Sequence, residues 1–196
     1  EKVFVMTDQN KAVKDKTIAV LGSTGSVGRQ TLDVAGRSGT HVAAISASSN
    51  VELLEQQIRK FRPRICAVRD EKAAKKLRLS VSDVKDVEVI AGEDAAVIAA
   101  GIPEADIVFN SMSGFAGLYP TLAAIEAGHD VALANKETLV AAGDIVMSEA
   151  DKHGCRILPV DSEHCAVFQC INSVGKRADE VKSVVLTASG GPFRGY

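Results

Sequence analysis

The chain has 196 residues, of which 46% are hydrophobic and 24% charged, and its formal net charge at pH 7 is −2. This composition is typical of a globular protein with a proper core, and the charge disfavours binding to nucleic acid or an anionic membrane through a basic surface. Aromatic residues make up only 4% and tryptophan is absent, which also disfavours nucleic-acid binding by base stacking.

Residues 1–15 carry charges of both signs. We expect them to form a short extension, because they lack the apolar segment of a secretory signal. No apolar run approaches the roughly 20 residues that span a bilayer, so the expected compartment is the cytoplasm.

The cysteines lie in apolar runs without paired C-x-x-C spacing, at Cys66, Cys155, Cys165 and Cys170. Three of them lie near His153 and His164, which raises the alternative of a zinc site. However, Cys165 and Cys170 are five residues apart, which in a helix places them on different faces. We therefore interpret the cysteines as buried, reduced thiols.

Short apolar runs alternate with helical patterns along the chain. The expected strands are residues 17–21, 41–47, 65–68, 87–90, 106–110, 130–134, 156–160 and 183–187. Several are almost continuously apolar, as in strands that are buried on both faces. Three sets of residues recur at the spacing of one helix face: Val27, Thr31 and Val34; Leu54, Ile58 and Phe61; and Leu118, Leu122 and Ile125.

Glycines mark the expected ends of helices, at Gly101, Gly128 and Gly154. Strands that alternate with helices in this way predict an α/β fold with a doubly wound, Rossmann-type parallel sheet. The alternation ends near residue 160, so we expect a second α/β domain to begin there.

The strongest local signal is the G-x-x-G-x-x-G pattern of residues 22–28, between an expected strand and an expected helix. Gly22 permits a tight turn, Gly25 lets the backbone approach a pyrophosphate, and Gly28 lets the helix pack closely on the strand. The start of the helix adds unpaired N–H groups and the positive end of the helix dipole. The alternative is a glycine-rich turn without a ligand, but this context favours dinucleotide binding.

The second expected strand ends in residues 45–50 (ISASSN), which contain no carboxylate. NAD enzymes usually place an acid there to bind the ribose 2′-hydroxyl. Small hydrogen-bonding residues tolerate a 2′-phosphate instead, which favours NADP. In an alternative compatible with this one, Ser49 or Asn50 caps the next helix.

Residues 134–138 (ANKET) follow another expected strand. The carboxyl ends of parallel strands face the ligand crevice, so Lys136 and Glu137 are candidate site residues. The alternative is a helix start that is capped by Asn135 and has Glu137 in its first turn.

Residues 158–164 (LPVDSEH) also follow a strand. In an extended chain Asp161 and Glu163 point the same way and offer hard oxygen ligands to Mg²⁺ or Mn²⁺. The alternative is a helix cap with an acidic first turn. Ser162 and His164 share a face, but no nucleophile elbow surrounds Ser162, so we reject a serine hydrolase.

Residues 186–194 (LTASGGPFR) place a Ser/Gly turn after the last expected strand. The backbone N–H groups of such a turn can form an anion-binding concavity. The alternative is a plain turn.

In this order, the motifs resemble those of the 1-deoxy-D-xylulose 5-phosphate reductoisomerases, enzymes of non-mevalonate isoprenoid biosynthesis and the target class of fosmidomycin. The resemblance covers nearly the whole chain from Lys16 and is carried by GSTGSVG (22–28), SGFAGLYPTLAAIEAG (113–128), LANKETL (133–139), PVDSEHCAVFQ (159–169) and LTASGGPFR (186–194). It implies a homodimeric enzyme that uses NADPH and Mg²⁺ or Mn²⁺. The implied reaction isomerises and reduces 1-deoxy-D-xylulose 5-phosphate to 2-C-methyl-D-erythritol 4-phosphate.

The resemblance also implies roles for individual residues. The implied NADPH contacts at the pyrophosphate are Thr24, Gly25, Ser26 and Val27, and those at the adenosine phosphate are Ser48, Ser49 and Asn50. Asn135 and Glu137 are further implied NADPH contacts. Relatives often have a lysine at the position of Ser49. The implied metal ligands are Asp161 and Glu163, which with Lys136 form the catalytic set, and the implied substrate contacts are Lys136, Ser162 and Ser189. After the extension of residues 1–15, residues 16–160 would form the NADPH-binding Rossmann domain and residues 161–196 the incomplete beginning of the catalytic, metal-binding domain.

Two other functions stay open. The first is another NADP-dependent oxidoreductase, such as a semialdehyde dehydrogenase, although no cysteine lies at the Gly-rich or electropositive turn that a nucleophilic thiol needs. The second is a cofactor-binding module without catalysis. Family members continue beyond the position of Tyr196 with further phosphate and metal ligands, so we expect this chain to be truncated and inactive by itself.

Overall fold

The computed structural model of the chain describes residues 16–173 and 181–185. Its strands are β1 (Thr17–Leu21), β2 (His41–Ala47), β3 (Ile65–Val68), β4 (Glu88–Ala91), β5 (Ile107–Asn110), β6 (Asp130–Leu133) and β7 (Ile157–Pro159). Its helices are α2 (Ser26–Ser38), α3 (Val51–Phe61), α4 (Glu71–Ser80), α5 (Ala95–Ala100), the 3₁₀ helix η1 (Gly114–Gly117), α6 (Leu118–Glu126), α7 (Lys136–His153) and α8 (Ser162–Ser173). None of these helices is long and apolar enough to cross a membrane.

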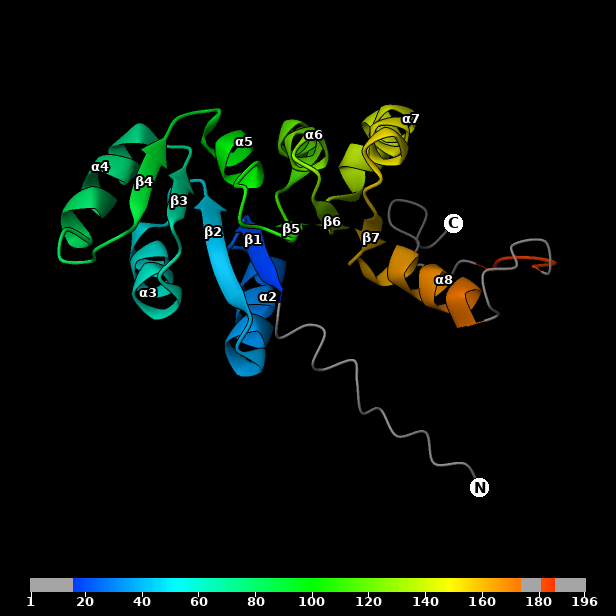
Figure 1. The fold of residues 1–196 in the computed structure, drawn as a ribbon, viewed down its shortest axis with the longest axis horizontal. Coiled ribbons are helices and arrows are strands. Elements are labelled where there is room, and N and C mark those ends of the chain that lie inside the picture. Colours follow the sequence, from blue (N-terminus) through cyan, green and yellow to red (C-terminus); the bar gives the residue numbers. More distant parts are fainter. Residues whose placement is uncertain (1–15, 174–180, 186–196) are drawn as a thin grey trace, which may run out of the picture.

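The strands form one parallel seven-stranded sheet in the order β4-β3-β2-β1-β5-β6-β7. The chain builds outward from β1 to β4 and then returns to place β5 on the other side of β1 (Figure 1). Ligands of open α/β sheets bind outside the carboxyl ends of the strands at such a reversal. The predicted Rossmann-type parallel α/β fold is confirmed.

An apolar core lies on each face of the sheet. In β1, Ile18 and Val20 belong to the core that includes residues of α2, α3 and α4, whereas Ala19 and Leu21 belong to the core that includes residues of α5, α6 and α7. Figure 1 shows α2 and α3 on one side of the sheet and α5, α6 and α7 on the other. Because both faces are covered, the strands are apolar at successive positions rather than at alternate ones.

Four strands differ from their predicted limits by one residue, β5 and β6 at one end and β4 and β7 at both ends. The structure assigns no strand to residues 183–185, and the other two residues of that predicted strand lie outside the described residues. Helix α2 packs through Gly28, Leu32 and Ala35, while Val34 is 61% exposed. The apolar spacing of Val27 and Val34 therefore predicted the helix correctly, but it predicted the wrong side of the helix as buried.

The predicted burial of the cysteines is right for only one of them. Cys66 lies inside β3, and its burial raises the pKa of the thiol to about 12. Cys155 and Cys165 are half-buried and Cys170 is exposed; the last two lie on α8, which packs mainly on the edge strand β7. No disulfide joins any two of these four cysteines.

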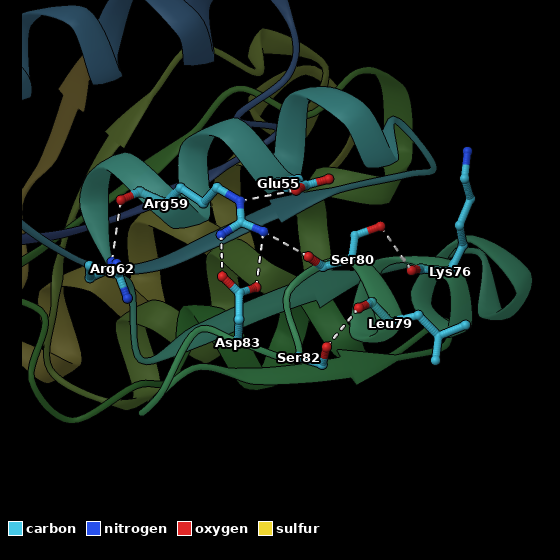
Figure 2. Close-up of polar contacts among 8 residues, drawn as sticks. All are labelled: Glu55, Arg59, Arg62, Lys76, Leu79, Ser80, Ser82 and Asp83. Atoms are coloured by element: carbon cyan, nitrogen blue, oxygen red, sulfur yellow. Dashed lines mark hydrogen bonds and ion pairs between the residues drawn. The ribbon is translucent and has the colours of Figure 1, made fainter.

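A surface cluster around Arg59 joins α3 to the connection between α4 and β4 (Figure 2). Its guanidinium donates from Nε to Glu55 at 3.0 Å, and from Nη1 and Nη2 to Asp83 at 2.8 and 3.0 Å. Nη2 also donates to the carbonyl oxygen of Ser80 at 2.8 Å. These bonds raise the pKa of Arg59. They connect α3 to the segment that leads into the edge strand β4.

Candidate functional site

The glycine-rich turn between β1 and α2 lies at the reversal of the sheet. Gly22 has a φ of +75°, and a Cβ there would lie 2.8 Å from the carbonyl oxygen of Ser111, which follows β5. A Cβ on Gly28 would lie 2.3 Å from the carbonyl oxygen of Gly22. These two glycines allow β1, α2 and the end of β5 to meet.

Gly25 has a different role in the turn. Its φ is −74°, and a Cβ there would meet only the carbonyl oxygen of Gly22, at 3.3 Å. No described side chain caps the first turn of α2, whereas Asn50, Asp70 and Asn135 cap α3, α4 and α7. The first N–H groups of α2 therefore remain available to an anionic ligand.

Buried hydrogen bonds hold this turn in place. The hydroxyl of Ser23 donates to Oε1 of Gln57 at 2.7 Å, and Nε2 of Gln57 donates to the carbonyl oxygen of Ser23 at 2.9 Å. The backbone N–H of Gly22 donates to Oγ of Ser46 at 3.2 Å. Because Ser23 is fully buried, this network fixes the shape of the turn before a ligand binds.

A cleft of about 690 Å³ opens along the carboxyl ends of β1 to β5, within the roughly 300–1,000 Å³ of small-molecule sites. Residues of the glycine-rich turn line it together with the ends of β2 and β3 and the segment that follows β5. Phe115 and Tyr119 form an edge-to-face ring pair in its wall, with centroids 6.3 Å apart.

The structure brings part of the predicted cofactor set to this cleft. Thr24, Gly25 and Ser48 line it. Ser26 and Val27 are exposed in the first turn of α2. Asn50 caps α3 by accepting the backbone N–H of Leu53 at 3.1 Å, which confirms the capping alternative for that residue, and Ser49 beside it is exposed.

Asn135 is 1% exposed, and its side chain is fully engaged. Its amide donates to the carbonyl oxygens of Met112 at 2.7 Å and Gly114 at 2.8 Å. Its Oδ1 accepts the backbone N–H of Thr138 at 3.0 Å, so the predicted cap of α7 is confirmed. Asn135 thereby holds the segment after β5 against the cleft.

Asn110, the last residue of β5, was not among the predicted site residues. Its amide donates to the carbonyl oxygen of Gly117 and to Oγ1 of Thr121, both at 2.8 Å. A Cβ on Gly117 would lie 2.8 Å from Cγ of Asn135. The signal available in the sequence was an asparagine at the carboxyl end of an expected apolar strand.

A second cluster lies at the carboxyl ends of β6 and β7. Oδ1 of Asp161 accepts the backbone N–H of His164 at 2.9 Å, and Oδ2 lies 2.8 Å from Nδ1 of the same residue. The hydroxyl of Ser162 donates to Glu163 at 2.7 Å. Because α8 begins at Ser162, the expectation that Asp161 and Glu163 share a face of an extended chain is wrong, and the helix-cap alternative describes Asp161.

Lys136 nevertheless links the two carboxylates electrostatically. Burial raises the pKa of Asp161, but the hydrogen bonds of His164 and the charges of His164 and Lys136 outweigh it, so that the pKa is lowered. The hydroxyl of Ser162 contributes most to the lowered pKa of Glu163, and the charge of Lys136 adds to it. Both groups are therefore ionised at neutral pH.

These two carboxylates fit a hard divalent cation as an incomplete site. Mg²⁺ prefers six oxygen ligands, and the described residues contain no group of three or more His, Cys, Asp and Glu side chains suited to a metal. Water, substrate or other protein groups would complete such a site. The substrate contact predicted at Ser189 and the motif of residues 186–194 lie outside the described residues.

The far wall of the cleft was also not predicted from the sequence. Arg69 follows β3 and Glu93 lies just after β4, and both line the cleft. Nε of Arg69 lies 3.0 and 2.9 Å from the two carboxylate oxygens of Glu93. Both positions follow expected strands, so the rule that ligands bind at the carboxyl ends of strands would have found them.

The chain matches two family models of reductoisomerases. Residues 18–143 match the model of 1-deoxy-D-xylulose 5-phosphate reductoisomerase, and residues 157–196 match the model of its C-terminal domain. The reductoisomerase of Agathobacter rectalis is 50% identical over 181 residues, which are 92% of this chain and 47% of the relative. That of Chlorobaculum tepidum is 47% identical over 181 residues, or 91% and 47%. The chain spans about half the length of the curated relatives it matches.

Solved structures show the same similarity. A 1-deoxy-D-xylulose 5-phosphate reductoisomerase from Zymomonas mobilis in complex with NADPH superposes with a TM-score of 0.84 at 41% identity, covering 92% of this chain and 47% of that one. A reductoisomerase in complex with NADPH, fosmidomycin and magnesium superposes with a TM-score of 0.81 at 35% identity, covering 89% and 45%.

Proposed function

The chain belongs to the 1-deoxy-D-xylulose 5-phosphate reductoisomerase family, and we propose that it supplies the NADPH-binding half of such an enzyme. The observation that carries this proposal is the uncapped first turn of α2, which opens through Gly25 onto a cleft of about 690 Å³. Backbone N–H groups at a helix start bind pyrophosphate. We assign Thr24, Gly25, Ser26 and Val27 to the pyrophosphate and Ser48, Ser49 and Asn50 to the adenosine end.

The start of α7 contributes to both halves of the site. Asn135 is buried, so we propose that it serves the cofactor by positioning residues 112–114 at the cleft. Lys136 and Glu137 are exposed in the first turn of α7, and we assign them to substrate and cofactor.

Asp161 and Glu163 would hold Mg²⁺ or Mn²⁺, because both are ionised and offer hard oxygen atoms. The ion would act as Lewis acid and template for the substrate oxygens, and NADPH would supply the hydride. Ser162 and Lys136 would orient the sugar phosphate, with Ser189 at its phosphate. The proposed reaction converts 1-deoxy-D-xylulose 5-phosphate to 2-C-methyl-D-erythritol 4-phosphate for isoprenoid biosynthesis.

The proposed organisation is an extension of residues 1–15, a Rossmann domain of residues 16–160 and the beginning of the catalytic domain in residues 161–196. The separate family-model matches to residues 18–143 and 157–196 support this division. We propose a cytoplasmic enzyme that is a homodimer in its longer form and has a small sugar phosphate as substrate. A net charge of −2 favours neither nucleic acid nor membrane as a partner.

A chimaera tests this function. The carboxyl-terminal half of the Agathobacter rectalis relative would be joined to this chain, and the loss of NADPH absorbance would be followed with substrate and Mg²⁺ or Mn²⁺. We expect turnover by the chimaera and none by the 196-residue chain, because Asp161 and Glu163 are the two metal ligands that we propose among its described residues. In the chimaera, Asp161→Asn should abolish turnover while NADPH affinity stays within about twofold, because the two sites use different residues. A folded chimaera that binds NADPH without turnover, or turnover by the 196-residue chain, would contradict the proposal.

A further inference from the structure

We infer that Arg69 selects NADPH over NADH by binding the 2′-phosphate of the cofactor. This inference rests on the proposed cofactor site and names a specificity residue within it. Residues 48–50 at the end of β2 offer two hydroxyls and an amide to the 2′-phosphate, but no positively charged side chain.

The neighbouring strand supplies the missing cation. The backbone N–H of Arg69 donates to the carbonyl oxygen of Ala47 at 3.1 Å, and that of Asp70 donates to the carbonyl oxygen of Ser48 at 3.0 Å. Arg69 therefore lies directly beside Ser48, and both residues line the cleft. In this fold the end of β2 is where the adenosine ribose binds.

The guanidinium of Arg69 retains donors for a ligand. Its contacts with Glu93 use Nε, and within the described part of the chain neither Nη group has a hydrogen-bond partner. Its side chain is 57% exposed. A guanidinium fork binds phosphate through two parallel hydrogen bonds, and a phosphate monoester carries nearly two negative charges at neutral pH.

Two acidic residues, Asp70 and Glu93, lie next to Arg69. Asp70 uses its carboxylate to cap α4 by accepting the backbone N–H of Ala73 at 2.7 Å, and Glu93 pairs with Arg69. Without Arg69, Glu93 would present an unpaired carboxylate to the ligand, the feature with which NAD enzymes bind the ribose 2′-hydroxyl. Arg69 would thus both attract NADPH and mask an acid that favours NADH.

Arg64 provides a matched control. It precedes β3, as Arg69 follows it, and it also pairs with an exposed glutamate, Glu104. The two arginines lie at opposite ends of one strand, and only Arg69 lines the cleft. Arg64→Gln removes the same charge from the chain without touching the cleft.

Calorimetric titration of the 196-residue chain with NADPH and with NADH tests the inference. Arg69→Gln should weaken NADPH binding by about tenfold or more, because two charge-assisted hydrogen bonds are lost. It should leave NADH affinity unchanged or higher, Arg69→Lys should retain part of the preference, and Arg64→Gln should change neither affinity. Competition by 2′,5′-ADP should weaken in Arg69→Gln, while competition by 5′-AMP should not.

The results separate this inference from the proposed function. If the parent chain binds neither dinucleotide, the cofactor site itself is wrong and the inference fails with it. If the parent binds NADPH and Arg69→Gln binds it equally well, only the inference is overturned. An equal loss of NADPH and NADH affinity would also overturn it, because Arg69 would then contact a part that the two cofactors share, such as the adenine.

Discussion

Gly28 lies so close to Gly22 that a Cβ on residue 28 would be 2.3 Å from the carbonyl oxygen of residue 22. The same oxygen accepts the backbone N–H of Gly25 at 3.0 Å. This close contact places the first turn of α2 directly behind the glycine-rich turn, so that its N–H groups reach the cleft. Gly28 therefore serves packing, whereas Gly25 serves the approach of a ligand.

Gly28→Ala should destabilise the protein. Alanine favours a helix by about 1 kcal/mol over glycine, but overpacking costs typically about 1–3 kcal/mol and sometimes more, and here the obstacle is backbone that cannot rotate away. We expect the free energy of unfolding in urea to fall by about 2 kcal/mol. An unchanged or higher value would contradict the contact.

Asn135→Ala should destabilise the protein by about 2–4 kcal/mol, because it removes a helix cap and leaves the carbonyl oxygens of Met112 and Gly114 without their donor. Asn135→Asp should recover the cap but not the two donors. If Asn135 positions the cleft wall, Asn135→Asp should stay destabilised and bind NADPH weakly, because its buried carboxylate would face the two carbonyl oxygens. Full recovery of affinity by the aspartate would argue against this positioning role.

His129 should make the stability depend on pH. It is 5% exposed, and its burial lowers the pKa of the imidazole against the opposing effects of the carbonyl of Ile102 and the charge of Asp106. The unfolded chain then binds the proton more readily, so the free energy of unfolding falls as the pH falls below about 6.5. Between about pH 7.5 and about pH 5.5, the free energy of unfolding measured by denaturation should fall less in His129→Asn than in the parent. Equal falls in the two proteins would assign the pH dependence to other groups.

Lys136→Met should raise the pKa of both Asp161 and Glu163, because the lysine charge lowers both in the folded protein. Carboxyl carbon chemical shifts measured by NMR against pH would report the two groups separately. The substitution of Lys152, which pairs with Glu149 at the far end of α7, serves as the control. A shift in neither carboxylate would show that Lys136 is not coupled to the proposed metal ligands.

Local patterns predicted the fold better than the site. The alternation of apolar strands and helices and the spacing of Gly22, Gly25 and Gly28 are local, so they identified the parallel sheet and the turn. The buried side of α2 was predicted wrongly, because Gly28, the first of its buried residues, has no side chain, and the apolar spacing of Val27 and Val34 excludes Leu32 and Ala35. The geometry of Asp161 and Glu163 was misjudged because a helix begins between them.

The other residues of the cleft come from separate parts of the sequence. Arg69 meets Ser48 only because β3 pairs with β2, and Asn110 meets Gly117 only once the segment after β5 has folded back. Neither relationship leaves a periodic pattern. Once the strand order is known, Arg69 and Ser48 can be placed side by side at the carboxyl edge of the sheet.

Titration of the 196-residue chain and its Gly25→Val variant with NADPH, in a calorimeter, tests the central claim most directly. The valine Cβ would meet only the carbonyl oxygen of Gly22, so the variant should remain folded, with a loss of about 1 kcal/mol at this helix cap. We predict saturable binding of NADPH by the parent and at least about tenfold weaker binding by the variant, because the side chain occupies the place where backbone must approach the pyrophosphate. Equal affinity of the two proteins for NADPH would contradict the account.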